Sequence, residues 1–386
     1  MTDFQSTMKV ISLILLFFML AEGSYAQGNC TDESIMALKG KWIKNTAYDA
    51  GKAKSPEAVR HMDKMVQLLQ SAYELAGTEA KYWYDEKKDA SWIKNTAFPY
   101  SLNADFMEYY CNSFQKTNNL KLGNETGDWF FIWANTFGRF AMLDQDFMIE
   151  NRQVYQLTPQ LGELDGFPLF AGADGNELQG SKQFSRTILV SRTGQLPYTP
   201  VSRKQYLLAF LKYREESYKV DVAYETKRPV RSDAEEEEAK KQGYDKADQF
   251  SGPDQRDKDR AKSNYLRFYV SDKEEHQNAL TQMEATYRKD IKPAEDFLDS
   301  QPAEELSKPA LLKPGNHKND FKIFENEPKG RMLVAVNENY FTKQPGYNPQ
   351  FFAVYWMWGG NSPGTNFGLQ VEKNFDFRSL QQMLDK

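Results

Sequence analysis

The chain has 386 residues, of which 27% are charged, and its formal net charge at pH 7 is −5. This mildly acidic balance, without a basic stripe, argues against nucleic acid as a partner, because phosphate backbones are bound by clustered positive charge. A chain of this length exceeds the roughly 250–300 residues that one hydrophobic core usually supports. We therefore expect two domains, or one domain with a large insertion.

The N-terminus has the pattern of an export signal. Lys9 supplies a positive charge, Val10–Leu20 is an uninterrupted apolar run, and Ser24 and Ala26 are small residues in front of a cleavage point after Ala26. The apolar run is shorter than the roughly 20 residues that span a bilayer, and no later run is longer. Residues 1–26 are therefore expected to be a cleaved signal peptide, with a retained anchor as the alternative. The sequence predicts an exported protein, periplasmic or extracellular, without a transmembrane segment after cleavage.

Cys30 and Cys111 are the two cysteines of the chain. In an exported protein an even number of cysteines favours a disulfide, because the compartment is oxidising. A reactive thiol is the alternative, although no histidine lies near either cysteine in the sequence. We expect a disulfide between these two residues.

The first half of the chain combines short helices with a meander of strands. Glu33–Lys44 has the spacing of a short amphipathic helix, and Ser55 with Pro56 is typical of the start of a second helix. Apolar runs bounded by Gly and Pro turns then predict four strands, at Trp129–Phe137, Val154–Leu157, Phe167–Phe170 and Thr187–Val190. This succession favours an antiparallel sheet, and the fold class is predicted to be α+β.

The hexapeptide WIKNTA occurs twice, at Trp42–Ala47 and at Trp92–Ala97. The residues that flank the two copies differ, whereas members of a repeat family share more than one hexapeptide. The repetition therefore does not predict a duplicated domain, and its meaning stays open.

The middle of the chain is charged and has a helical period. Ser202 and Gln205 have the spacing of a capping box, so a helix is expected from Ser202 to residue 227. Residues 231–262 are more than half charged and include four consecutive glutamates, which indicates a solvated helix or a disordered linker. A helical pattern returns near Asp254 and runs to Asp290.

Four prolines, at positions 293, 302, 309 and 314, then indicate a linker. We interpret residues 202–314 as an insertion made of a charged helical hairpin, with coiled-coil character, and a Pro-rich linker. The surrounding α+β domain is expected to comprise residues 27–201 and 315–386, mainly as an antiparallel sheet with N-terminal helices.

The C-terminal part of the chain returns to strands. Met332–Val336 is one, and Phe351–Trp358 is apolar at both odd and even positions, as a central strand covered on both faces would be. Phe367–Phe377 is expected to be a more amphipathic strand, and Asp376 to cap a final helix, Phe377–Leu384.

One catalytic motif, G-x-S-x-G, occurs at Gly360–Gly364 behind a predicted strand. A nucleophile elbow requires the backbone N–H of the residue after the serine, and Pro363 has none. The following segment does not read as a helix, and no histidine follows the motif. We therefore interpret this segment as a Gly/Pro hairpin loop rather than the active site of a serine hydrolase.

Metal and cofactor sites are not indicated. His61, His276 and His317 have no metal-ligand spacing, and His61 and His276 are expected at the surface. The segment Asp174–Glu177 lacks the frame of a calcium loop, and the glycines near it lack the spacing of a phosphate loop. No cofactor and no metal are expected.

Aromatic pairs remain as candidate ligand-binding residues. Trp129 with Trp133, and Trp356 with Trp358, have the spacing of residues on one face of a strand. Exposed tryptophans of this kind stack on sugar rings or other ligand rings, and buried ones belong to a core. The spacing favours the core and leaves ligand stacking as the alternative.

The whole chain after the expected signal peptide resembles uncharacterised exported proteins of Gram-negative bacteria, especially in the segment PYTPVSRKQYL, Pro197–Leu207, and in the apolar strand near the C-terminus. The resemblance implies an envelope location and no activity, cofactor or site. Two hypotheses follow. The first is a non-catalytic envelope protein that binds a ligand or another envelope protein, or has a structural role. The alternative is a hydrolase whose carboxylates converge only in the fold, and two facing carboxyl groups of raised pKa in a concave pocket would distinguish it.

Overall fold

The structure is a computed structural model that describes residues 30–49, 54–86, 96–112, 119–123, 127–172, 183–250, 253–313, 324 and 330–386. The expected signal peptide, the Asp174–Glu177 segment, His317 and most of the second WIKNTA copy lie outside this part. The chain divides into two compact units. Unit 1 contains the described residues up to Met142, with Leu157–Thr199 and Asn337–Lys386, and unit 2 contains Leu143–Gln156 and Pro200–Val336. The region expected as an insertion, 202–314, lies within unit 2.

The α+β fold class is confirmed, with two mostly antiparallel sheets in the described residues. The larger sheet has the order β1-β2-β3-β5-β14-β10-β9-β8, with β4 paired to β3. Its strands are β1 (Trp42–Lys44), β2 (Thr78–Glu86), β3 (Tyr100–Asn112), β4 (Asn119–Leu122), β5 (Asp128–Ala134), β8 (Gln160–Leu164), β9 (Phe167–Ala171), β10 (Gln183–Val190) and β14 (Phe352–Gly359). The β1–β2 pair is parallel.

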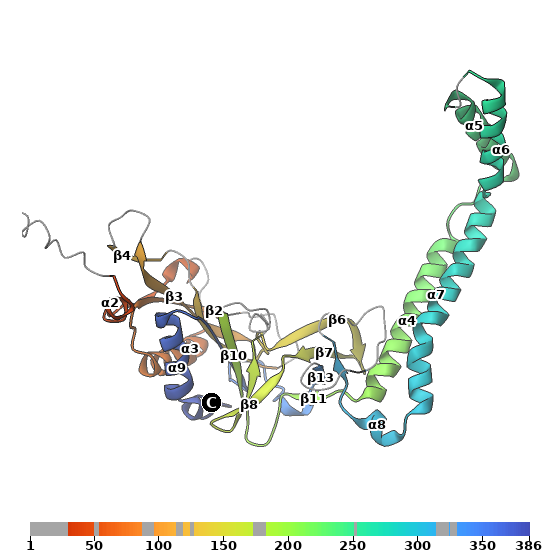
Figure 1. Ribbon diagram of the computed structural model, residues 1–386. Coiled ribbons are helices and arrows are strands. Elements are labelled where there is room, and N and C mark those ends of the chain that lie inside the picture. The colour runs from red at the N-terminus through yellow and green to blue at the C-terminus, as the bar shows by residue number, and fades with distance from the viewer. Residues whose placement is uncertain are drawn as a thin grey trace, which may run out of the picture. The chain divides into compact units, whose positions relative to one another are not determined.

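Strand β14 lies in the centre of this sheet, between β5 and β10. Its residues from Phe352 to Trp358 are all buried, which confirms the prediction made from an apolar pattern on both faces. One face packs on α3 (Pro56–Ala72), α9 (Ser362–Asn374) and α10 (Phe377–Gln381), and α3 and α9 lie side by side (Figure 1). This packing forms the main core of unit 1.

The segment expected as the strand Phe367–Phe377 is instead mostly helix α9, so that prediction was wrong. Asn361 caps the helix by accepting the Gly364 N–H at 2.9 Å. Gly364 and Gly368 weaken the helical pattern in the sequence, since glycine is a poor helix former. Tertiary packing requires both, because a Cβ on Gly368 would lie 2.6 Å from the Trp358 ring and one on Gly364 would lie 2.7 Å from the Gly359 carbonyl oxygen.

The helix expected over Glu33–Lys44 was also wrong in extent. Helix α2 covers only Asp32–Met36, and Trp42–Lys44 forms strand β1 beside β2. A Cβ on Gly40 would overlap the Thr78 carbonyl oxygen, at 1.7 Å. The segment after α2 therefore packs closely against β2 instead of continuing the helix. The short 3₁₀ helices η2 (Thr46–Asp49) and η5 (Glu338–Tyr340) complete the regular structure described before β14 in unit 1.

The smaller sheet has the order β11-β13-β7-β6, with β12 paired to β13. Its strands are β6 (Ala141–Ile149), β7 (Arg152–Leu157), β11 (Tyr198–Pro200), β12 (Leu311–Leu312) and β13 (Arg331–Val336). The helices of unit 2 are α4 (Arg203–Thr226), α5 (Asp233–Phe250), α6 (Gln255–Phe268), α7 (Asp272–Ser300) and α8 (Ala303–Ser307).

Helix α4 begins as expected, with both bonds of the capping box between Ser202 and Gln205. Tyr206 and Phe210 then lie in the core of unit 2, together with Val201 and with Ala294 of α7. A capping residue followed by apolar residues at helical spacing thus determines where α4 begins and which of its first residues enter the core of unit 2.

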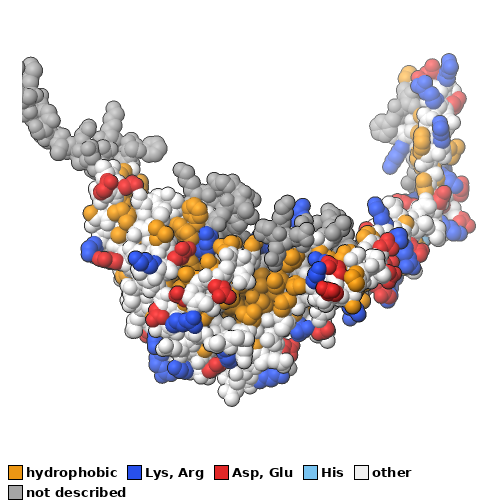
Figure 2. Space-filling view, turned by 60° about the horizontal axis from the view of Figure 1, so that its bottom comes forward, with side chains coloured by type: hydrophobic (Ala, Val, Ile, Leu, Met, Phe, Trp, Pro, Cys, Tyr) orange, Lys and Arg blue, Asp and Glu red, His pale blue; other side chains and the backbone are white. Residues whose placement is uncertain are grey.

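Two helix pairs make up the rest of unit 2. Helices α4 and α7 lie side by side (Figure 1), and the Arg214–Asp290 and His276–Glu225 contacts show that they are antiparallel. The coiled-coil character expected for them stays a prediction. Helices α5 and α6 form the second pair, and their surface mixes charged side chains of both signs with hydrophobic ones (Figure 2).

The proline boundary expected at Pro293 was wrong, because α7 runs through it to Ser300. Ile291 and Ala294 are buried on either side, and their packing holds the helix across the missing N–H. The pattern expected from Asp254 to Asp290 is also broken, since α6 ends at Phe268 and α7 begins at Asp272. Among the described residues no helix combines the length and the apolar character that crossing a membrane requires.

Removing the second helix pair is expected to change the stability of the remainder by no more than about 1 kcal/mol. The change replaces residues 232–269 with a short Gly/Ser linker. Helix α6 has no buried residue among those described, and the Arg231 N–H lies 2.8 Å from the Asp272 carboxylate, so the ends to be joined are adjacent. Thermal unfolding of the deletion variant and the parent measures the effect. Loss of the cooperative transition would contradict the expectation.

Candidate functional site

The four tryptophans that the sequence singled out lie on both faces of the larger sheet. Trp356 is fully buried and Trp358 is 9% exposed, and both belong to the main core of unit 1. Trp358 packs on Gly368 and stacks on the Phe184 ring at 5.6 Å. These two side chains are therefore part of the packing between β14 and its neighbours.

Trp129 and Trp133 lie on the opposite face and are half-buried. They pack with Phe131 and Tyr355, and the Arg139 guanidinium lies 5.2 Å from the centre of the Trp129 ring. The aromatic faces of this group contact one another and a cation of the same unit. The sequence placed these side chains on one face of a strand, but it did not indicate the arginine.

The G-x-S-x-G segment joins β14 to α9, so the expectation of a hairpin loop was wrong. A helix does follow the motif, contrary to one of the arguments made from the sequence. Ser362 is nevertheless the first residue of that helix, and its hydroxyl donates a hydrogen bond to the Asp32 carboxylate. Pro363 still provides no N–H for an oxyanion. The serine therefore serves to hold α2 against α9.

A pair of carboxyl groups lies beside this segment. Asp128, at the start of β5, accepts the Gly359 N–H at 2.8 Å, and Glu108 of β3 accepts a bond from the Asn361 amide. Asp128 is fully buried, and this burial together with the Glu108 carboxylate raises the pKa of Asp128 to about 8. The two residues are 20 positions apart on separate strands, and no sequence motif marks them.

The remaining oxygens of the pair, Oδ2 of Asp128 and Oε1 of Glu108, are buried and have no donor. One proton held on Asp128 can satisfy both oxygens, because a protonated carboxyl group donates as well as accepts. Since Asp128 is enclosed on all sides, it cannot contact a substrate. Asp128 has the raised pKa expected of one carboxyl group in a hydrolase site, but its position supports a different role, which is to hold the β14–α9 connection.

A polar pocket of unit 1, which we call the amide pocket, lies elsewhere and has a volume of about 430 Å³. It is lined by Arg192, Gln195, Asn339, Tyr340, Phe341, Thr342, Gln344, Asn348, Gln350 and Asp385. These residues come from the turn after β10, from the segment before β14 and from the end of the chain described. Three separate segments thus form one concave surface.

Hydrogen bonds fix the walls of the amide pocket. Asn337 ties the two longer segments together, because its side chain donates to the Leu196 carbonyl at 3.1 Å and its N–H to the Pro197 carbonyl at 3.0 Å. Gln350 is buried, and its side-chain amide accepts the Thr342 N–H and donates to the Thr342 carbonyl. These hydrogen bonds therefore hold the backbone segments that line the amide pocket in place before any ligand binds.

Arg192 and Asp385 form an ion pair on one side of the pocket. Two guanidinium nitrogens donate to the two Asp385 oxygens, at 2.7 and 2.5 Å, and a third donates to the Tyr340 carbonyl. The guanidinium also lies 4.5 Å from the centre of the Tyr340 ring. The hydrogen bond that Arg192 donates to Asp385 raises the pKa of Arg192, so this arginine stays charged.

Four side chains of the lining are exposed and make no hydrogen bond with the rest of the described chain: Gln195, Asn339, Thr342 and Gln344. They supply amide and hydroxyl groups to whatever enters the pocket. None of these four residues was predicted from the sequence. The available signal was the density of amides in Asn337–Gln350, where five of 14 residues are Asn or Gln.

Unit 2 has its own cavity, a groove of about 320 Å³ between α4 and α7. The Tyr218 and Tyr287 rings stack in it at 4.5 Å, and Met283 lies beside them. The two tyrosine rings, one from each helix, therefore pack on each other rather than presenting their stacked faces to a ligand. We therefore interpret the groove as a depression between two packed helices rather than as a ligand-binding site.

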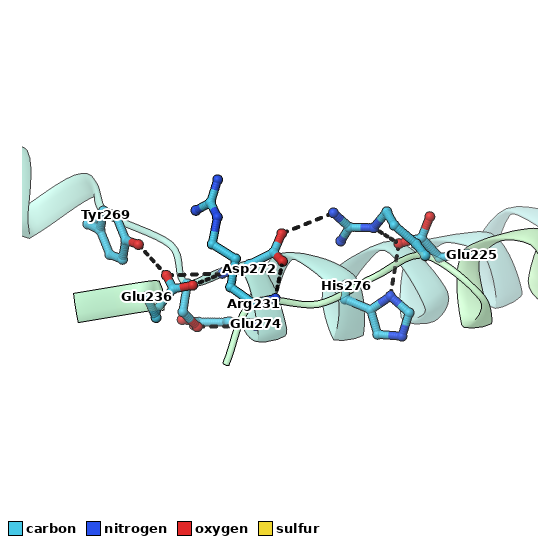
Figure 3. Close-up of polar contacts among 9 residues, drawn as sticks. Glu225, Arg231, Glu236, Tyr269, Asp272, Glu274 and His276 are labelled. Atoms are coloured by element: carbon cyan, nitrogen blue, oxygen red, sulfur yellow. Dashed lines mark hydrogen bonds and ion pairs between the residues drawn. The ribbon is translucent and has the colours of Figure 1, made fainter. Parts of the chain in front are cut away.

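A network of charged groups joins the two helix pairs (Figure 3). Glu225 accepts bonds from the Arg228 Nε at 2.7 Å and the His276 Nδ1 at 3.0 Å. Asp272 accepts from the Arg231 N–H at 2.8 Å, a bond that lowers the pKa of Asp272. Each carboxylate has its partners within the joint, so the network stabilises the connection rather than forming an open site.

His276, expected to be a surface residue rather than a ligand, has a partly buried side chain that is 17% exposed. His61 is also half-buried, where burial lowers its pKa and its Nδ1 lies 2.9 Å from the Tyr100 hydroxyl. In the part of the chain that the structure describes, no group of three or more His, Cys, Asp or Glu is placed to hold a metal ion. Comparison with protein-family models, with curated proteins and with solved structures gives no match for this chain.

Proposed function

We propose that this is an exported, non-catalytic binding protein that takes up a small polar ligand in the amide pocket of unit 1. The amide pocket carries this proposal, because it combines a volume of about 430 Å³ with four exposed polar side chains that lack internal partners. Ligand pockets commonly have volumes of roughly 300–1,000 Å³ and a few convergent polar groups. Unit 2 then acts as a spacer or as a contact surface towards another envelope protein.

Export is supported by the leader pattern of residues 1–26 and by the disulfide between Cys30 and Cys111. A disulfide of this kind persists in an oxidising compartment such as the periplasm or the outside of the cell. The proposal therefore places ligand uptake in the envelope or beyond it.

The binding proposal is tested with the double variant Gln195→Ala/Gln344→Ala. Both side chains are exposed, so the variant is expected to fold normally while losing two hydrogen bonds to the ligand, which lowers affinity about tenfold or more. A thermal-shift screen of small polar molecules on the wild type, followed by calorimetric titration of each hit on both proteins, measures this.

The matched control is Asn264→Ala/Gln277→Ala, which removes two exposed amides from the helices of unit 2. Every hit should bind this control as it binds the wild type. A screen without hits, or hits that bind all three proteins equally, would overturn the proposed function.

A further inference from the structure

We infer that the ligand of the amide pocket is a neutral polyhydroxylated molecule, a saccharide or a related polyol. This inference rests on the proposed function and adds the chemical class of the ligand. It follows from the balance of charge in the pocket, from the kind of hydrogen-bonding groups that it exposes and from the burial of its aromatic residues.

The charge of the pocket is balanced internally. Arg192 and Asp385 are the ionised residues of its lining, and they bind each other through two hydrogen bonds. The third guanidinium nitrogen is held by the Tyr340 carbonyl. An anionic ligand would have to break a charge-assisted, two-point ion pair to reach the arginine, so the pocket favours a neutral ligand.

The exposed groups both donate and accept hydrogen bonds. Each side-chain amide of Gln195, Asn339 and Gln344 has an N–H₂ donor beside a carbonyl acceptor, and the Thr342 hydroxyl does both. Ligand hydroxyl groups likewise donate and accept, so neighbouring hydroxyls on one molecule can satisfy both atoms of an amide. Carboxylate groups only accept, and a phosphate ion offers fewer donors than acceptors, so both would leave amide oxygens without donors.

The aromatic residues of the lining do not offer an apolar surface. Tyr340 is 4% exposed and Phe341 is 8% exposed, and the Arg192 guanidinium covers the Tyr340 ring. An apolar ligand would therefore place its surface against amide groups and remove their water without replacing the hydrogen bonds. The pocket is thus selective for hydroxyl-rich ligands.

The test is calorimetric titration of the whole mature protein with two sets of probes. The first set contains neutral monosaccharides, disaccharides and linear sugar alcohols, and the second contains inorganic phosphate and citrate. We expect saturable one-to-one binding of at least one member of the first set. Its affinity should change less than twofold between low and high salt, because no net charge is bound. The Gln195→Ala/Gln344→Ala variant should weaken it about tenfold or more, and Asn264→Ala/Gln277→Ala should not.

A second variant tests the role of the ion pair. Asp385→Asn keeps the backbone geometry, since Asp385 has a φ of 62° and Asn also adopts this region. It releases the Arg192 guanidinium, and the variant is expected to bind phosphate at least tenfold more tightly than the wild type does, in a salt-dependent manner.

The two proposals fail in different ways. Pocket-dependent, salt-sensitive binding of phosphate or citrate to the wild type would overturn the polyol assignment and leave the binding function standing. Absence of pocket-dependent binding for both probe sets and for the wider screen would overturn both.

Discussion

Replacing Cys30 and Cys111 with serine is expected to lower the free energy of unfolding by about 3–5 kcal/mol. The two sulfurs are bonded, which confirms the predicted disulfide, and the bridge joins residues 81 positions apart. It ties the segment in front of α2 to the far end of β3, so that α3 and β2 lie within the closed loop. The unfolded chain gains the most freedom when a loop of this length is opened, and the stability falls accordingly.

Equilibrium urea unfolding of the double variant and the oxidised wild type measures this loss. The wild type treated with a reductant is the matched control, because it opens the same loop without a substitution. Its midpoint should move in the same direction and by a similar amount. A change below about 1 kcal/mol in both would show that the bridge contributes little to the stability of unit 1.

Asp128→Asn is expected to make the protein more stable than the wild type at pH 8 and about equally stable near pH 4. In the folded protein Asp128 has a pKa of about 8, caused first by burial and then by Glu108. In the unfolded chain an aspartate has a pKa of about 3.9. Between these values the folded state holds a proton that the unfolded state has released, so the free energy of unfolding of the wild type falls as the pH rises.

The slope of this fall is up to about 1.4 kcal/mol per pH unit for one proton. Asparagine removes it because its side chain is neutral at every pH. Its oxygen can still accept the Gly359 N–H, and its nitrogen can donate to the Glu108 oxygen in place of the protonated Asp128 carboxyl group. The β14–α9 connection should therefore stay in place at high pH.

Urea unfolding at several pH values between 4 and 9 checks the prediction. Asp165→Asn is the control, since Asp165 is an exposed residue of the β8–β9 turn and its φ of 54° suits asparagine. This control should follow the wild-type profile. Parallel profiles for Asp128→Asn and the wild type would show that the buried carboxyl pair does not hold a proton in this range.

The sequence by itself determined the features that local signals encode. Apolar residues at odd and even positions identified β14 as a central strand, and the Ser202–Gln205 pair identified the first turn of α4. The α+β class followed from the succession of short strands and helical segments. The disulfide followed from the presence of two cysteines in a chain with an export signal. Each of these signals requires only neighbouring residues or a single pair.

Tertiary structure alone decided the features that depend on contacts between distant segments. Helix α9 was missed because Gly364 and Gly368 lower its helix propensity. The reason for these glycines is visible only in the structure, where Gly359 and Trp358 leave no room for a Cβ at either position. Helix α7 continues through Pro293 because buried neighbours on both sides hold it.

The carboxyl pair and the amide pocket show the same dependence on the fold. Glu108 and Asp128 are ordinary acidic residues until two strands place them side by side in a buried site. The pocket assembles Arg192, the amides of Asn337–Gln350 and Asp385 from three segments that no local pattern connects. A periodic pattern in the sequence indicates which face of a helix or strand is buried. Which polar groups from separate elements come together depends on the packing of the whole unit. That packing determined both the carboxyl pair and the amide pocket.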